Sequence, residues 1–167
     1  IRNLFELYMV LIIVTESTEK RKEFISAHEP EVSREVWHRY FTKTKLVSII
    51  LPDGLQIIGF HAFEYCDKLE EIVIPNTVMQ IRSQAFSGCN SLETIDLPDN
   101  LAVISWQCFY YCTNLKTLEL PETITHIARQ AFDGCYKLSS IRIPKNVTNI
   151  GNMAFFACYD LSEVYIE

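Results

Sequence analysis

The sequence predicts a right-handed, β-rich α/β solenoid that follows an N-terminal cap. From Leu46 onward the chain repeats itself every 23 residues. Each repeat opens with a short alternating run that ends in Pro, and closes on a Phe with a Cys three residues later. A fixed period of this length is typical of proteins whose units stack in a row, because one unit alone cannot bury its apolar face.

The repeats divide the chain into two predicted parts. Residues 1–45 form the cap, and residues 46–167 form the solenoid. The copies are 46–68, 69–91, 92–114, 115–137, 138–160 and a partial copy at 161–167. A chain of 167 residues suits one domain, and a stack of repeats has no upper limit of length.

Each copy predicts a strand followed by a second extended segment and a short helical turn. In the copy 69–91, apolar Ile72 and Ile74 alternate with other residues before Pro75, which marks a strand end. Equivalent strands are expected at 47–51, 93–97, 116–120, 139–143 and 162–166. Val78 and Ile81 predict a second extended segment. The i, i+4, i+7 spacing of Ala85, Cys89 and Leu92 predicts about one turn of α-helix or 3₁₀ helix.

Two residue types recur in register and are predicted to form columns in the core. The Phe column comprises Phe63, Phe86, Phe109, Phe132 and Phe155. The Cys column comprises Cys66, Cys89, Cys112, Cys135 and Cys158. An odd number of identical stacked thiols cannot all pair, and no Cys-x-x-Cys motif suggests a zinc site, so we expect reduced core thiols.

The repeats follow the pattern LxxIxIPxxVxxIgxxAFxxCxx, which resembles the BspA-like class of leucine-rich repeats over about three quarters of the chain. The resemblance implies a leucine-rich repeat solenoid. It also implies a surface or secreted protein of the adhesin or host-interaction type, and it brings no catalytic residues. Gly is present at the convex-turn position only at Gly59 and Gly151, whereas Arg82, Ser105 and Ala128 occupy the other copies.

The segment before the repeats contains two apolar patterns. Leu4–Val14 is strongly apolar but too short to cross a membrane, so it is either a buried segment of the cap or a targeting remnant. A second pattern at i, i+4, i+5, i+8 and i+9 predicts an amphipathic helix, with Val32, Val36, Trp37, Tyr40 and Phe41 on one face. This helix is expected to cover the first repeat, although a partner-binding helix has the same pattern.

Composition disfavours several classes of function. A net charge of −6 and a pI near 5.3 disfavour nucleic-acid binding and adhesion to anionic lipid. The four His residues have no ligand spacing, so no metal and no cofactor are expected. No phosphate-binding loop or nucleophile motif occurs, and neighbouring Asp96 and Glu119 are expected to be solvated surface charges, so an enzyme is disfavoured.

Two surfaces are candidate binding sites for a protein partner. The first is the outward strand ribbon, formed by Val73, Asp96, Glu119, Arg142 and Tyr165 together with Ile50. The second is an aromatic face on the turn side, where Trp106, Tyr110, Tyr111 and Tyr136 occupy variable repeat positions. The leading hypothesis is a non-enzymatic protein-recognition module on the cell surface or secreted. The alternative is an intracellular scaffold domain of a longer multidomain protein.

The partial copy at 161–167 predicts a further contact surface. It supplies a strand but no Ala-Phe or Cys, so the core next to it is expected to be open. An unpaired strand edge at Val164, Tyr165 and Ile166 favours pairing with another chain. Either further repeats or a cap follow in the natural protein, or two chains meet here, and we expect a chain of these residues alone to self-associate.

Overall fold

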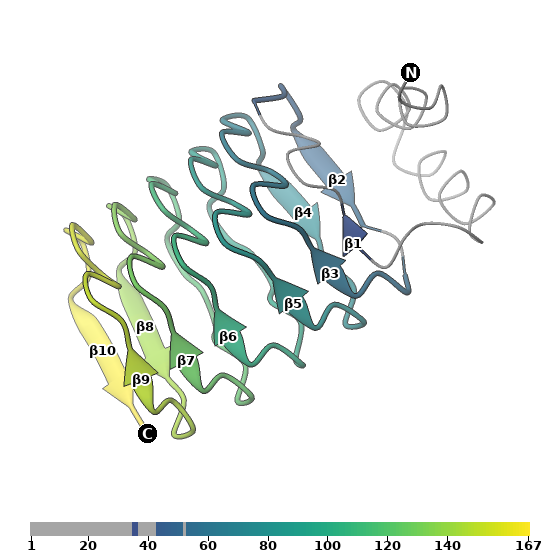
Figure 1. The fold of residues 1–167 in the computed structure, drawn as a ribbon. Helices are drawn as coiled ribbons and strands as arrows, with labels where there is room; N and C mark the ends of the chain where they lie inside the picture. The colour runs from purple at the N-terminus through teal and green to yellow at the C-terminus, as the bar shows by residue number, and fades with distance from the viewer. Residues whose placement is uncertain (1–34, 37–42, 52) are drawn as a thin grey trace, which may run out of the picture.

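The computed structural model describes residues 35–36, 43–51 and 53–167, and its repeats stack side by side in one direction (Figure 1). Each repeat forms one coil with three sides. The first extended segment of each coil lies in one row and the second strand lies in another row. The coil then returns over a third side, made of turns, before the next coil begins (Figure 1).

The strands pair in parallel with their counterparts one repeat away, as the period predicts. Ser48 lies opposite Glu71, and Ser140 lies opposite Glu163. The first row contains β2 (Ser48–Ile50), β4 (Glu71–Val73), β8 (Ser140–Ile143) and β10 (Glu163–Ile166). The second row contains β1 (Glu35–Val36), β3 (Ile57–Ile58), β5 (Gln80–Ile81), β6 (Val103–Ile104), β7 (His126–Ile127) and β9 (Asn149–Ile150).

The turn side corrects the prediction of short helices, because the described residues contain no helix. Instead, each coil makes consecutive turns closed by i→i+3 hydrogen bonds, such as Ser87 N to Gln84 O and Cys89 N to Phe86 O. On the turn side, each coil from Leu46 onward has two residues with left-handed backbone angles, for example Gln107 (φ 51°) and Tyr111 (φ 56°). A left-handed residue cannot continue a right-handed α-helix, so the chain changes direction at each of these points.

The Phe column is present and buried over most of its length. Neighbouring rings are stacked with centroids 5.3–5.6 Å apart and interplanar angles of 2–5°. Phe63, Phe86, Phe109 and Phe132 are fully buried, whereas Phe155 is only partly buried. The column therefore forms a continuous apolar axis through the stack.

The Cys column is also present, and its thiols both pack in the core and donate hydrogen bonds. All six cysteines of the chain are free. Each thiol from Cys89 onward in the column donates to a Phe carbonyl of the preceding coil, as Cys112 does to Phe86 O at 3.1 Å. Burial raises the pKa of Cys112 to about 12 and that of Cys158 to about 11. Neutral thiols thus cross-link consecutive coils through hydrogen bonds.

The N-terminal segment corrects the prediction of a helix at residues 32–41. Glu35–Val36 is instead a strand that pairs with Ile57–Ile58 of β3, and this pairing extends the second row by one coil. The register is 22 residues rather than 23. Val32, Trp37, Tyr40, Phe41 and the apolar segment Leu4–Val14 lie outside the described residues.

The same 22-residue register continues at residues 43–45. Lys43 has a left-handed φ of 60°, close to the 56° of Tyr65 one coil later, and its amide donates to Glu64 O. Thr44 lies 3.6 Å from the thiol of Cys66, so a hydroxyl occupies the place of the column cysteine. Residues 35–36 and 43–45 are therefore the described part of a degenerate coil before Leu46. The division between a cap and a solenoid stays a prediction.

The two strand rows are interrupted between the coils 69–91 and 92–114. Segments 93–97 and 116–120 are not the strands that were predicted, since a single bridge between Thr94 and Thr117 joins them. Across residues 53–167, β5 and β6 are not paired either. The turn side is continuous at this junction, where Gly88 N donates to Tyr110 O at 2.7 Å. In the second row the Ser105 hydroxyl donates to Ile81 O.

We expect this junction to exchange amide hydrogens faster than the next one. Lys116, Thr125 and Ala128 each donate a backbone hydrogen bond to the preceding coil. Their counterparts one coil earlier, Glu93, Ala102 and Ser105, make no such bond in the described structure. Hydrogen exchange followed by NMR should show protection at least about tenfold lower at these three amides. Equal protection in the two sets would contradict an interrupted ladder.

Candidate functional site

The structure places the predicted outward ribbon on the solvent side of the first row. Val73, Asp96, Glu119, Arg142 and Tyr165 are all exposed, because the residues between them, such as Ile72 and Ile141, point into the core. Successive side chains of an extended segment point to opposite faces, so exposed and buried residues alternate along it. The ribbon changes in character along the stack. It is apolar near β4, acidic over 92–122, and basic and aromatic over β8 and β10.

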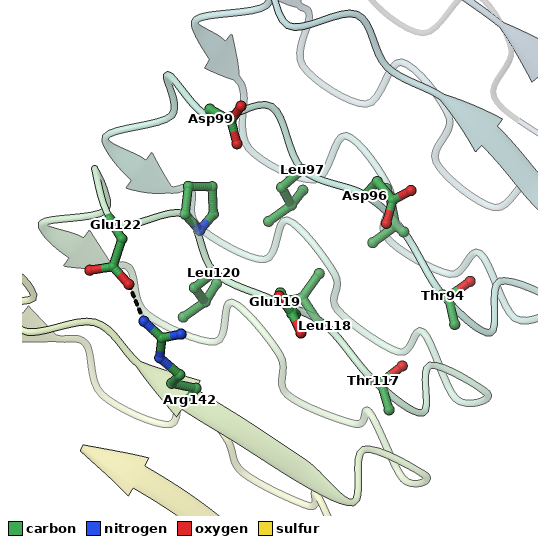
Figure 2. Close-up of a pocket in the computed structure, with 12 residues that line it drawn as sticks. Thr94, Asp96, Leu97, Asp99, Thr117, Leu118, Glu119, Leu120, Glu122 and Arg142 are labelled. Atoms are coloured by element: carbon green, nitrogen blue, oxygen red, sulfur yellow. Dashed lines mark hydrogen bonds and ion pairs between the residues drawn. The ribbon is translucent and has the colours of Figure 1, made fainter. Parts of the chain in front are cut away.

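The central part of the ribbon is a groove of about 770 Å³. It lies over the two segments that share only the bridge from Thr94 to Thr117, so the interrupted row and the groove coincide. Figure 2 shows Asp96 and Glu119 on neighbouring segments, with Arg142 beyond them. The lining residues are Thr94, Ile95, Asp96, Leu97, Asp99, Thr117, Leu118, Glu119, Leu120, Pro121, Glu122 and Arg142.

The groove is acidic, and part of that charge is neutralised within the chain. Arg142 is the only basic lining residue. It forms an ion pair with Glu122 (Figure 2) and another with Glu167. The hydrogen bond to Glu167 raises the pKa of Arg142 further. Asp96 and Glu119 make no ion pair with any described residue, so their charges face solvent. The groove can accordingly attract positively charged groups.

Sequence reasoning found the ribbon but missed the groove. Asp99 and Glu122 follow Pro98 and Pro121 at the end of the segments, and the prediction treated that turn as a strand end only. Their repeat position is shared by Asn76, whose side chain donates to Asp99 Oδ2 at 3.3 Å. The recurrence of polar residues directly after each Pro is the signal that could have identified them.

The predicted aromatic face is continuous and partly exposed. Tyr110 and Tyr111 have ring centroids 4.6 Å apart, Tyr111 and Tyr136 are 5.8 Å apart, and Tyr136 and Tyr159 are 5.3 Å apart. Trp106 is 43% exposed and Tyr111 is 41% exposed. A hydrogen bond with Tyr111 raises the pKa of Tyr136. Both candidate surfaces consequently remain available to a partner.

Two tyrosines of the turn side are fixed by glycines one coil away. The Tyr65 ring occupies the space of a side chain at Gly88, and the Tyr111 ring does the same at Gly134, where a Cβ would lie 2.9 Å from the ring. Both glycines also have left-handed backbone angles. Each of these Tyr and Gly residues occupies the same repeat position, so large and small residues alternate along the stack.

Replacing Gly134 with Ala is therefore expected to cost stability in two ways. The left-handed backbone costs roughly 1 kcal/mol, and the clash with Tyr111 adds about 1–2 kcal/mol. Gly54→Ala is the matched control, since Gly54 is left-handed (φ +84°) but has nothing within 4 Å of its Cβ position. Urea unfolding should show that Gly134→Ala lowers the free energy of unfolding more than Gly54→Ala does. In a chain that also carries Tyr111→Ala, the two glycine substitutions should cost the same. Equal losses in the presence of Tyr111 would refute the steric fit.

The strand β10 pairs with β8 on one side, and Val164, Tyr165 and Ile166 are exposed. Self-association through this edge stays a prediction for a polypeptide of these 167 residues.

The described residues contain neither a candidate metal site nor a candidate membrane-spanning helix. Among them, no group of three or more His, Cys, Asp or Glu side chains could hold a metal ion. Within the same part of the chain, no helix has the length and apolarity needed to cross a membrane.

The repeat geometry agrees with a known family. The BspA-type leucine-rich repeat family matches residues 34–162 in six copies. The chain belongs to this family. The match begins at residue 34, next to β1, which is consistent with a degenerate coil before Leu46. Among curated proteins, none is significantly similar to the chain.

Solved structures of other leucine-rich repeat proteins share the fold. A T. pallidum leucine-rich repeat protein has 36% identity and a TM-score of 0.76, over 78% of this chain and 62% of that one. A leucine-rich cell surface protein from Faecalibacterium prausnitzii has 29% identity and a TM-score of 0.64, over 79% of this chain and 42% of that one. The pneumococcal vaccine antigen PcpA has 25% identity and a TM-score of 0.62, over 72% and 30% of the two chains.

This BspA-type chain thus spans less than two thirds of the length of these proteins. One of them is described as a cell surface protein and another as a vaccine antigen, and none is described as an enzyme.

Proposed function

We propose that this BspA-type chain is a non-enzymatic protein-recognition module that binds its partner through the outward strand ribbon. The observation that carries the proposal is the groove of about 770 Å³, in which Asp96 and Glu119 lie on neighbouring segments and form no ion pair with any described residue. Exposed Val73 lies on one side of this acidic centre and exposed Tyr165 on the other. Apolar and aromatic contacts supply binding energy, while the charges select the partner and steer its approach.

The partner that best complements this surface is a protein with a basic patch flanked by apolar residues. The chain as a whole has a net charge of −6, and four of the lining residues of the groove are acidic. Recognition of such a partner is expected to weaken as the salt concentration rises.

We place this module on the cell surface or in the secreted fraction. The names of the F. prausnitzii cell surface protein and of the pneumococcal antigen support that location. An intracellular scaffold domain is the alternative. Antibody labelling of intact source cells distinguishes the two, since a surface protein is labelled without permeabilisation and a scaffold only after it.

The double variant Asp96→Lys with Glu119→Lys tests the binding surface. Binding to proteins of neighbouring or host cells should fall at least tenfold, because the charge of the groove is reversed. The matched control changes Asp53 and Asp160 to Lys, which gives the same change of charge at exposed positions outside the groove. We expect the control to retain binding within about twofold. Equal losses in both double variants would show that net charge, rather than the ribbon, governs binding.

A further inference from the structure

The turn side of the first full coil carries two aromatic rings that are each covered by a cation of the chain itself. The guanidinium of Arg82 stands over Phe60 at 5.3 Å from the ring centroid. The ammonium of Lys43 stands over Tyr65 at 5.9 Å. Distances below about 6 Å are those of an attractive cation–π contact. These rings therefore show how cations are accommodated on this side of the stack.

The same two positions are aromatic again two coils later. Trp106 occupies the repeat position of Phe60, and Tyr111 occupies that of Tyr65. The residue corresponding to Arg82 is now Ala128, and the residue corresponding to Lys43 is now Gly88, so neither can supply a charge. Trp106 is 43% exposed, and in the described structure no cation stands over Trp106 or Tyr111.

We propose that Trp106 and Tyr111 receive arginine side chains of a partner protein, in the places that Arg82 and Lys43 fill on the first coil. Trp gives the strongest cation–π contact of the aromatic residues, and Arg also stacks its planar guanidinium on the ring. This surface lies on the turn side, so it is separate from the groove and independent of the function proposed for it.

Tyr111 is already fixed for such a contact. Its ring packs against Gly134 and contacts the rings of Tyr110 and Tyr136, so little side-chain freedom is lost on binding. Arg129 occupies the position of Trp106 in the next coil and is exposed, but it is not placed over that ring. The contact between a cation and the ring, rather than the net charge of the surface, is therefore the basis of recognition.

Titration with acetyl-arginine amide tests the proposal directly. The indole N–H signal of Trp106, assigned by its loss in Trp106→Phe, should shift and saturate in NMR spectra. Acetyl-citrulline amide has nearly the same shape without the charge and should shift the signal at most one fifth as much. Equal shifts with both compounds would overturn the proposal.

Three variants test the comparison between the two coils. Ala128→Arg is expected to place a guanidinium over Trp106 from within and to reduce the arginine-induced shift at least fivefold. Ala102→Arg adds the same charge at an exposed position on the second row and should leave that shift unchanged. Arg82→Ala removes the guanidinium that lies over Phe60, whose ring signals should then begin to respond to acetyl-arginine amide. Equal behaviour of the two arginine insertions, or no response of Phe60, would contradict the repeat-based assignment.

Discussion

Above pH 9 the folded state is expected to lose stability steeply because the core contains several buried thiols. Cys89, Cys108, Cys112 and Cys135 are at most 1% exposed. Burial raises the pKa of Cys112 from 9.0 to about 12, and it raises the pKa of each of the other three well above 9.0. Such a thiol holds its proton more tightly in the folded chain than in the unfolded chain.

The sign of the effect follows from this difference. Below pH 9 the thiols are protonated in both states, so the stabilisation is fully present. As the pH rises from 9 toward the folded pKa, only the unfolded chain releases protons, and stability is lost. Each thiol contributes about 1.4 kcal/mol per pH unit, so Cys112 alone contributes about 4 kcal/mol by pH 12. The other three thiols add losses of the same sign, so the total loss should be larger than that from Cys112 alone.

Guanidinium unfolding at pH 7, 8, 9, 10 and 11, with reductant throughout, measures this loss. Cys112→Ala is the informative control. It should be about 1–2 kcal/mol less stable than the natural sequence at pH 7, because it leaves a small cavity and removes the hydrogen bond to Phe86 O. Above pH 9 its stability should fall less steeply, by about 1.4 kcal/mol per pH unit, because it lacks one buried thiol. If the two curves ran parallel from pH 7 to 11, buried thiols would not be the cause.

Phe109→Ala is expected to give the largest loss of any single change in the stack, about 3–5 kcal/mol. Phe109 is fully buried, and its ring stacks at 5.6 Å on Phe86 and at 5.4 Å on Phe132. Deleting the ring leaves a cavity in the coil 92–114, between the rings of Phe86 and Phe132. Urea unfolding at pH 7 measures the change in the free energy of unfolding.

Phe155→Ala provides the matched comparison. Phe155 is only partly buried and stacks on Phe132 at 5.3 Å, so its removal opens a smaller cavity. Its loss should be about half of that at Phe109. A loss at Phe155 as large as that at Phe109 would contradict a column whose stability comes from stacking on both sides.

The period, the strand register and the core columns were predictable because the same residue types are buried at the same place in every coil. The turn side was not. The i, i+4, i+7 spacing of Ala85, Cys89 and Leu92 suits a helical turn and also suits two successive i→i+3 turns. Only the left-handed angles at Gln84 and Gly88 distinguish them, and Gln is not a residue that signals such an angle.

Two further features had weak signals in the sequence. The first strand row is interrupted at 93–97, although Glu-Thr-Ile-Asp-Leu alternates as regularly as the sequence of β4. The degenerate first coil was missed because its register is 22 residues, which places Val36 opposite Ile58. Allowing a one-residue deletion would have aligned Thr44 with Cys66 as well. The groove is lined by segments of neighbouring repeats together, so the pattern within a single repeat does not predict it.

The most direct test of recognition through the ribbon is site-specific photo-crosslinking. A benzoylphenylalanine placed at Thr117, an exposed residue that lines the groove, should capture a protein partner from the surface of neighbouring or host cells. Excess unmodified chain should compete for that capture, and Asp96→Lys with Glu119→Lys should abolish it. The same group placed at Ala102, which is exposed but outside the groove, should capture no such partner. Capture from Ala102 as strong as that from Thr117, or none from Thr117, would contradict the assignment of the ribbon as the binding surface.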